Sequence, residues 1–131
     1  MEIRKADATD LSEIASILDA AYLQLEIDSL RERIAAGTVL VAVATRNGPA
    51  VSGSTGPILG ALVLAGETIT AIAVRPGRRG QGIGSALVSE AKTRRERLVA
   101  AFDPPVRSFW ESVGFAVRKQ PGSKRLRGVT R

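Results

Sequence analysis

The chain has 131 residues, 44% of them apolar, which is the size and composition of one compact domain with a buried core. It has neither cysteine nor histidine, which excludes disulfides, thiolate nucleophiles, serine–histidine triads and zinc sites built from Cys or His. The formal net charge of +6 favours anionic partners, although solubility is the simpler explanation of the charge taken by itself.

The first part of the chain has the pattern of two helices. Apolar residues recur at helical spacing over 11–25, and Asp10 with Glu13 resembles a capping box at the start of this helix. Ser29 with Glu32 repeats the capping pattern. We therefore predict a second, short helix after the first.

Three strands and a loop follow. Residues 38–44 are β-branched and apolar, which predicts a strand. Residues 46–57 are rich in Gly, Pro, Ser and Asn and predict a loop within the domain. Two further strands, over 58–65 and 68–74, are separated by a two-residue turn, so they are expected to pair as an antiparallel hairpin.

The second half alternates helices and strands. Apolar periodicity predicts a helix over about 83–97, a strand over 98–102, a short helix over 106–113 and a strand over 115–119. The basic residues of about 119–131 predict a solvated or partner-facing tail. This order of elements is typical of a mixed α/β domain.

A glycine-rich segment joins the third strand to the long helix. Its sequence is Arg79-Gly80-Gln81-Gly82-Ile83-Gly84, and we call it the glycine loop. Glycines let a backbone approach a ligand closely, and the free N–H groups of a helix's first turn attract anions. Arg75 and Arg78 lie beside the loop and add positive charge. The loop is therefore predicted to bind phosphate, in preference to being a turn shaped only by its glycines.

Two general phosphate-binding motifs do not fit this loop. A P-loop ends in Gly-Lys-Ser/Thr, whereas this loop continues as Gly82-Ile83-Gly84-Ser85 without a lysine. The dinucleotide-binding fingerprint has its three glycines at a different spacing. Neither class of nucleotide site is favoured.

In two motifs the chain resembles the GCN5-related N-acetyltransferase (GNAT) family. That family has Arg/Gln-x-x-Gly-x-Gly/Ala after a strand ending in Val-x-Pro, and this chain has Val74-Arg75-Pro76 followed by the glycine loop. The family's second motif is an Asn, a Phe-Tyr pair and a Gly-Phe pair. Asp103, Phe109-Trp110 and Gly114-Phe115 stand here at the matching spacing.

The resemblance implies an α/β fold, the single-domain acyl-CoA N-acyltransferase (GNAT) fold, with a mixed, mostly antiparallel sheet and flanking helices. One domain would span 1–131, with the basic tail at about 119–131. The implied reaction is direct attack of a primary amine, on a small molecule or a peptide, on the thioester of acetyl-CoA, without a metal. Homodimers are common in the family. No leader and no run of apolar residues long enough to span a membrane is evident, so a cytoplasmic location is expected.

The resemblance also assigns cofactor-binding residues. The backbone of the strand end would hold the acetyl and pantetheine groups, and the strand that begins at Leu98 would diverge from it to open a gap. The glycine loop with the residue after it would hold the pyrophosphate, and an aromatic residue of the short helix would line the cleft. In order, these residues are Ile72, Ala73, Val74, Arg79, Gly80, Gln81, Gly82, Ile83, Gly84, Ser85 and Trp110.

Candidate catalytic groups are few. Trp110 stands where the family often has a tyrosine acid, and an indole N–H donates a hydrogen bond without supplying a proton near neutral pH. Asp103 replaces the usual Asn and could take a proton or attract a cationic substrate, or it could only cap the following helix. Glu67 could activate an amine through water, although a solvated turn residue is the commoner role.

These departures leave an alternative function open. A CoA-binding regulatory or assembly module with little or no catalysis would not need the missing tyrosine. Nucleic-acid binding by the basic tail is disfavoured, because no aromatic residues are interleaved with its cations.

Overall fold

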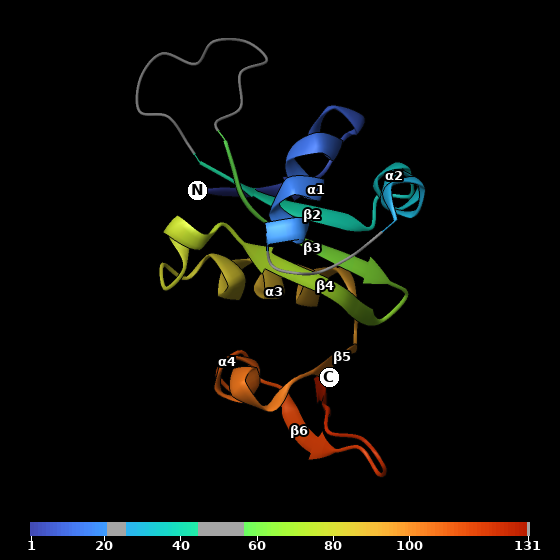
Figure 1. Cartoon of the computed structure of the whole chain (residues 1–131), viewed down its shortest axis with the longest axis vertical. Helices are drawn as coiled ribbons and strands as arrows, with labels where there is room; N and C mark the ends of the chain where they lie inside the picture. The colour runs from blue at the N-terminus through green and yellow to red at the C-terminus, as the bar shows by residue number, and fades with distance from the viewer. Residues whose placement is uncertain (21–25, 45–56, 131) are drawn as a thin grey trace.

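The computed structural model describes residues 1–20, 26–44 and 57–130, and their strands form one mixed sheet (Figure 1). The strand order across the sheet is β1-β2-β3-β4-β5-β7-β6. Among the described strands, only the contact between β4 and β5 is parallel, so the predicted mixed, mostly antiparallel sheet is confirmed. The strands are β1 (Glu2–Lys5), β2 (Val39–Val43), β3 (Ile58–Ala65), β4 (Thr68–Val74), β5 (Leu98–Phe102), β6 (Ala116–Lys119) and β7 (Leu126–Thr130).

Helices cover both faces of the central strands. Helices α1 (Leu11–Ala20) and α2 (Ile27–Ala35) pack on one face, where α1 contacts β3 and β4. Helix α3 (Ile83–Arg94) packs on the other face against β2, β3 and β4, and the short α4 (Arg107–Ser112) contacts β6. Because β3 is covered on both sides, nearly all of its residues are buried, which explains its continuous apolar run.

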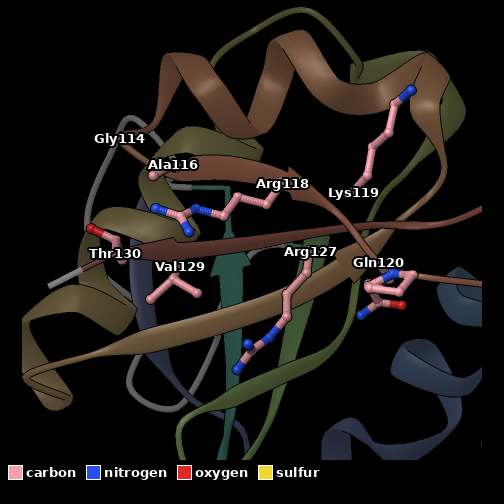
Figure 2. A pocket seen from close by; sticks show the side chains of 9 residues that line it. Gly114, Ala116, Arg118, Lys119, Gln120, Arg127, Val129 and Thr130 are labelled. Carbon is pink, nitrogen blue, oxygen red and sulfur yellow. The ribbon is translucent and has the colours of Figure 1, made fainter.

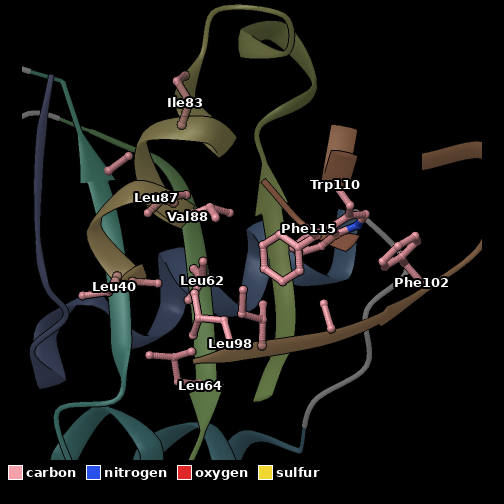
Figure 3. Packing of buried hydrophobic residues seen from close by; sticks show 14 of the residues in the cluster. Leu40, Leu62, Leu64, Ile83, Leu87, Val88, Leu98, Phe102, Trp110 and Phe115 are labelled. Atoms are coloured by element: carbon pink, nitrogen blue, oxygen red, sulfur yellow. The ribbon is translucent and has the colours of Figure 1, made fainter. Parts of the chain in front are cut away.

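The two faces of the sheet have separate apolar cores. Ile14, Leu18 and Leu30 of α1 and α2 pack against one face of the sheet. On the other face, Leu87 and Val88 of α3 lie against the sheet, and an aromatic group gathers at the end nearer β5 (Figure 3). Burial of this kind stabilises a fold by about 25 cal/mol per Å² of apolar surface.

Two strands were not predicted from the sequence. The segment of β1 is short and has one apolar residue, Ile3, among three charged ones, and among the described strands β1 pairs with β2 alone, at the margin of the sheet. The segment of β7 lies within the predicted basic tail, yet β7 pairs with both β5 and β6. Within the predicted solvated or partner-facing tail of about 119–131, Leu126–Thr130 is therefore a paired strand of the sheet rather than an extension beyond it.

Helix boundaries also differ from the predictions. Helix α3 ends at Arg94 rather than at residue 97. Helix α2 begins at Ile27 without a side-chain cap, so the capping pattern at Ser29 and Glu32 was wrong. The part of the first helix predicted beyond residue 20, and the predicted loop up to residue 56, lie outside the described residues.

The capping box before α1 uses a different pair from the predicted one. The Asp7 side chain accepts a hydrogen bond from the Thr9 N–H, and the Asp7 N–H donates to Asp10 Oδ2 at 2.9 Å. Asp10 also receives two hydrogen bonds from the Arg4 guanidinium, at 2.8 and 3.2 Å. This buried carboxylate therefore joins β1 to the start of α1.

The Arg4–Asp10 pair predicts a pH-dependent contribution to stability. The hydrogen bond from Arg4 lowers the pKa of Asp10 against the opposing effect of burial. Its stabilisation is present above the unfolded-state pKa of about 3.9 and is lost as pH falls through the lower folded-state pKa. Asp10→Asn should lower the free energy of unfolding by about 1–3 kcal/mol at pH 7. In thermal melts, the Tm gap between wild type and variant should shrink below about pH 4.

The control for this experiment is Asp28→Asn. Asp28 pairs with Arg31 on the exposed surface of α2, with 71% of its side chain accessible, so its removal should change Tm little at any pH. A constant Tm gap between wild type and Asp10→Asn from pH 7 to pH 2 would contradict the assignment.

A close approach of β3, β4 and α3 predicts a second effect on stability. A Cβ atom on Gly60 would lie 2.9 Å from the Ala73 carbonyl oxygen and 3.2 Å from Cγ2 of Ile83. Gly60→Ala should therefore lower the free energy of unfolding by about 1–3 kcal/mol, measured by urea denaturation. Gly77→Ala is the matched control, because a Cβ there meets no atom within 4 Å. Equal losses in the two variants would refute the packing argument.

Candidate functional site

The central feature of the sheet is the divergence of β4 from β5. The pairing between β4 and β5 ends at Ile69 and Ala100. From there β4 continues to Val74 paired with β3, and β5 continues to Phe102 paired with β7. The strand beginning at Leu98 thus diverges from the preceding one, as predicted. The two strands pair at two adjacent positions only, Thr68 with Val99 and Ile69 with Ala100.

The gap between these strands is a cleft of about 750 Å³, within the usual range for small-molecule sites. Its walls are the end of β4, the glycine loop with the first turn of α3, and the end of β5 with α4. The structure brings together here most of the site residues predicted from the sequence. Those lining the cleft are Ile72, Ala73, Val74, Arg79, Gly80, Gly82, Ile83, Gly84, Ser85, Asp103 and Trp110.

The glycine loop has the backbone of an anion site. Gly80 and Gly82 have φ values of 79° and 80°, which residues with a side chain rarely adopt. Gly82 is the N-cap of α3, and no side chain caps this end of the helix. The N–H groups of the first turn have no partners within the helix, so they and the helix dipole are available to an anion at the cleft.

Gly84 allows α4 to pack closely on α3. A Cβ on Gly84 would lie 3.2 Å from Cε1 of Phe109, so the aromatic ring covers the first turn of the helix. Phe109 is half-buried and lines the cleft. The last glycine of the loop therefore serves packing, and the two before it serve the conformation of the turn.

Trp110 is both a core residue and part of the cleft wall. Its relative exposure is 4%, and its ring stacks on Phe102 with a centroid separation of 5.2 Å and an interplanar angle of 15°. The Phe115 ring meets it edge-on at 4.9 Å (Figure 3). Gly128 of β7 allows this packing, because a Cβ there would lie 3.1 Å from both phenylalanine rings.

Asp103 lies at the cleft mouth with a partner that the sequence did not reveal. It occupies the N-cap position of the turn after β5, but its side chain makes no capping hydrogen bond. Instead, its Oδ1 lies 3.5 Å from Nε of Arg125, whose NH2 group donates to the Ala101 carbonyl at 2.9 Å. Arg125 also lines the cleft. Only the position of β7 beside β5 brings it there, so sequence spacing could not have found it.

Three predicted residues lie elsewhere. Glu67 is exposed in the turn before β4, at the opposite end of that strand from the glycine loop, and is not among the cleft residues. Gln81 is exposed and does not line the cleft. The Arg75 side chain donates to the Ile58 carbonyl and to Glu13 of α1, so it holds strand ends together rather than adding charge to the loop.

Among residues 1–20, 26–44 and 57–130, no three acidic side chains converge as ligands for a metal ion. In the same part of the chain, no helix has the length and apolar character needed to cross a bilayer.

Comparison with known proteins agrees with this geometry. A model of the acetyltransferase (GNAT) domain family matches residues 35–117. This range includes the glycine loop, the end of β4 and the aromatic wall of the cleft, which is formed by Phe102, Phe109 and Trp110. A search of curated proteins gives no significant match. Residue 125 and the whole of β7 lie outside the matched range.

Several solved structures share the fold. A GCN5-related N-acetyltransferase from Rhodopseudomonas palustris superimposes with a TM-score of 0.74 at 15% identity, over 98% of this chain and 94% of that one. Ribosomal-protein-alanine N-acetyltransferase from Brucella melitensis has a TM-score of 0.70 at 21% identity, over 99% of both chains. Rv2747 from Mycobacterium tuberculosis, solved with CoA and NLQ, has a TM-score of 0.70 at 20% identity, over 94% and 76%. At these identities the likeness concerns the fold.

Proposed function

Because the chain belongs to the acetyltransferase (GNAT) domain family, we propose that the cleft between β4 and β5 binds acetyl-CoA and that residues 1–131 form a single domain around it. The family consists of acetyl-CoA-dependent N-acetyltransferases. The observation that carries the proposal is that the strand divergence and the uncapped start of α3 open into the same cleft.

The cleft offers matching groups for both ends of the cofactor. Beyond Ile69, the edge of β4 that faces the gap is not paired with β5, so an extended pantetheine arm can bind to the backbone of residues 72–74 as an added strand would. The pyrophosphate would lie on the amides of residues 79–85, with the charges of Arg78 and Arg79 beside it. Gln81 would contribute through its backbone.

The reaction proposed here is direct transfer of acetyl to a primary amine on a small molecule or a peptide. The amine nitrogen forms a bond to the acetyl carbon, the carbon–sulfur bond breaks, and the CoA thiolate leaves while the nitrogen loses a proton. Asp103 at the cleft mouth is the candidate to receive that proton or to hold the ammonium group. Its pairing with Arg125 is exposed and therefore weak, which leaves the carboxylate accessible. Glu67 is not proposed as a catalytic residue, because it does not line the cleft.

A second candidate function is a CoA-binding regulatory or assembly module with little catalysis. The observation that favours it is Trp110, which occupies the position of the family's usual tyrosine acid and is buried among phenylalanines. Acetyl-CoA binding is common to both functions, whereas thiol release in the presence of an amine belongs only to the first. A cytoplasmic location and a homodimer are further proposals from the family resemblance.

Calorimetric titration with acetyl-CoA and with CoA tests the cleft. The wild type should bind both. Gly82→Trp should weaken binding about tenfold or more, equivalent to about 1.4 kcal/mol, because the residue has positive φ and faces the pyrophosphate site. Gly66→Trp is the control, since Gly66 also has positive φ but lies in the turn before β4. No binding by the wild type, or equal binding by Gly82→Trp, would refute the proposal.

Trp110→Tyr and Trp110→Phe test whether a missing acid limits turnover. Both remove the indole, but only tyrosine offers a hydroxyl that can protonate the leaving thiolate. General acid catalysis contributes about 10²–10⁴-fold, so thiol release by Trp110→Tyr should exceed that by Trp110→Phe by about tenfold or more. Thermal melts check that the packing against Phe102 survives. Equal rates would exclude a proton-donor role at this position, and release by the tyrosine variant alone would favour the non-catalytic alternative for the wild type.

A further inference from the structure

The positive charge of the chain is concentrated at one end. Residues 112–131 contain six Lys and Arg and no Asp or Glu. The 13 acidic residues of the chain are balanced by its remaining 13 basic residues, so this segment carries the whole formal net charge of +6. Long-range attraction of an anion is therefore directed to the β6–β7 region.

The arginines of this segment share an open face of the sheet. Arg118 of β6 and Ala101 of β5 both stand opposite Arg127 of β7. All three are exposed, while the neighbouring Phe102 and Leu126 point to the core on the other face. We call this exposed surface of β5, β7 and β6 the basic face. Helix α1 packs beside it on β3 and β4.

The basic face contains a hollow of about 720 Å³ (Figure 2). Ala116 and Val129 stand opposite each other in its apolar floor, and Arg118 and Arg127 line it from the same face, whereas the Lys119 ammonium points away from them (Figure 2). None of the described residues that line it is acidic. Its size and its single sign of charge suit a small anionic group with an attached chain.

The cations of the hollow have no acidic partners in the part of the chain that the structure describes. Arg118, Lys119 and Arg127 form no ion pair there, whereas Arg4, Arg94 and Arg107 each pair with a carboxylate. Like charges directly opposite each other on two strands are destabilising. An anion bound on the basic face would offset this repulsion, so the arrangement favours a bound carboxylate or phosphate.

The hollow and the proposed acetyl-CoA cleft have no lining residue in common, and β7 with the preceding Arg125 connects them. Arg125 lies two residues before Arg127, about 7 Å along the chain, and lines the cleft. Its NH2 group is fixed on the carbonyl of Ala101, the residue that stands opposite Arg127. A molecule lying on the basic face can therefore reach the cleft mouth past Arg125 and Asp103.

We propose that the basic face selects amine acceptors that carry a carboxylate or phosphate group, bound by Arg118 and Arg127 while the amine reaches the cleft. This proposal rests on the proposed acetyltransferase function. A second copy of the chain is a poor occupant, because it would bring the same positive segment to the contact. Single-stranded nucleic acid is also disfavoured, since no aromatic side chain of the hollow offers a stacking surface for bases.

The test compares acceptors that differ only in charge. Two short peptides with a free N-terminal amine carry Glu or Gln at their second and third positions, and two small alkylamines carry either a phosphate or a hydroxyl. Thiol release gives KM and kcat for each, and calorimetry gives peptide Kd with CoA-saturated protein. The charged member of each pair should have a KM at least about fivefold lower, because charge-assisted hydrogen bonds to the two arginines are stronger than neutral ones even when solvent screens them.

Substitutions of the two arginines test whether they cause the preference for charged acceptors. Arg118→Gln and Arg127→Gln should each raise KM and Kd for the Glu peptide about fivefold to tenfold, and the double variant should abolish the preference for Glu over Gln. Their acetyl-CoA affinity and kcat should match the wild type. Arg33→Gln, an exposed arginine on α2, makes the same change in net charge and should change neither KM nor Kd. Thermal melts confirm that each variant is folded.

The contrary outcomes are distinct. Acetyl-CoA binding together with equal KM and Kd for charged and neutral acceptors, or an unaltered preference in the double variant, would overturn the acceptor proposal alone. Absence of acetyl-CoA binding would overturn the proposed function and the acceptor proposal with it. Binding of a single-stranded oligonucleotide that is tighter than that of the Glu peptide and is lost in the double variant would reassign the basic face to nucleic acid.

Discussion

The parallel contact between β4 and β5 is the constraint on which the rest of the site depends. Each strand is occupied on its other edge, β4 by β3 and β5 by β7, so neither can bend across to close the gap without losing antiparallel pairs. A parallel connection also requires a crossover, which here is α3. The crossover helix starts where β4 ends, so one topological constraint places a free strand edge, a helix N-terminus and the glycine loop at the same cleft.

The sequence predicted the parts of this arrangement that depend on neighbouring residues. The apolar run of β3, the β3–β4 hairpin and the glycine loop all have local patterns, and β4 with the glycine loop makes up one wall of the cleft. The other wall, formed by the end of β5, α4 and Arg125, depends on the pairing of β5 with β7, two strands that are far apart in the sequence. Charged side chains obscure the alternation of β7, and its place between β5 and β6 brings Arg125 to Asp103. Arg75 was misjudged for a similar reason, because its partner Glu13 lies 62 residues away.

The aromatic residues around Trp110 stabilise the fold, but they place an indole where the family usually has a tyrosine acid. The chain has three phenylalanines and one tryptophan, and all four gather around α4 and β5. This cluster attaches the β5–β7–β6 half of the sheet to α3, and the absence of a side chain at Gly128 lets the rings approach β7. A tryptophan in its centre adds buried area over a tyrosine. It also removes the one group at that position that could protonate a leaving thiolate, so stability and proton transfer make opposing demands on Trp110.

The two ends of the proposed reaction depend on different physical interactions. Acetyl-CoA would be bound largely by backbone groups of β4 and the first turn of α3, within the range matched by the family model. The acceptor would meet charged side chains that begin at Arg118, directly beyond that range. A backbone site recognises a group common to every reaction of the family, whereas side chains on an open sheet face can differ without disturbing the cleft. Arg125 is where the two meet: its NH2 group is fixed on β5, its Nε faces Asp103, and it therefore holds the negative charge of the cleft mouth beside the positive charge of the basic face. An acceptor that carries both an amine and an anion would match these two charges in that order.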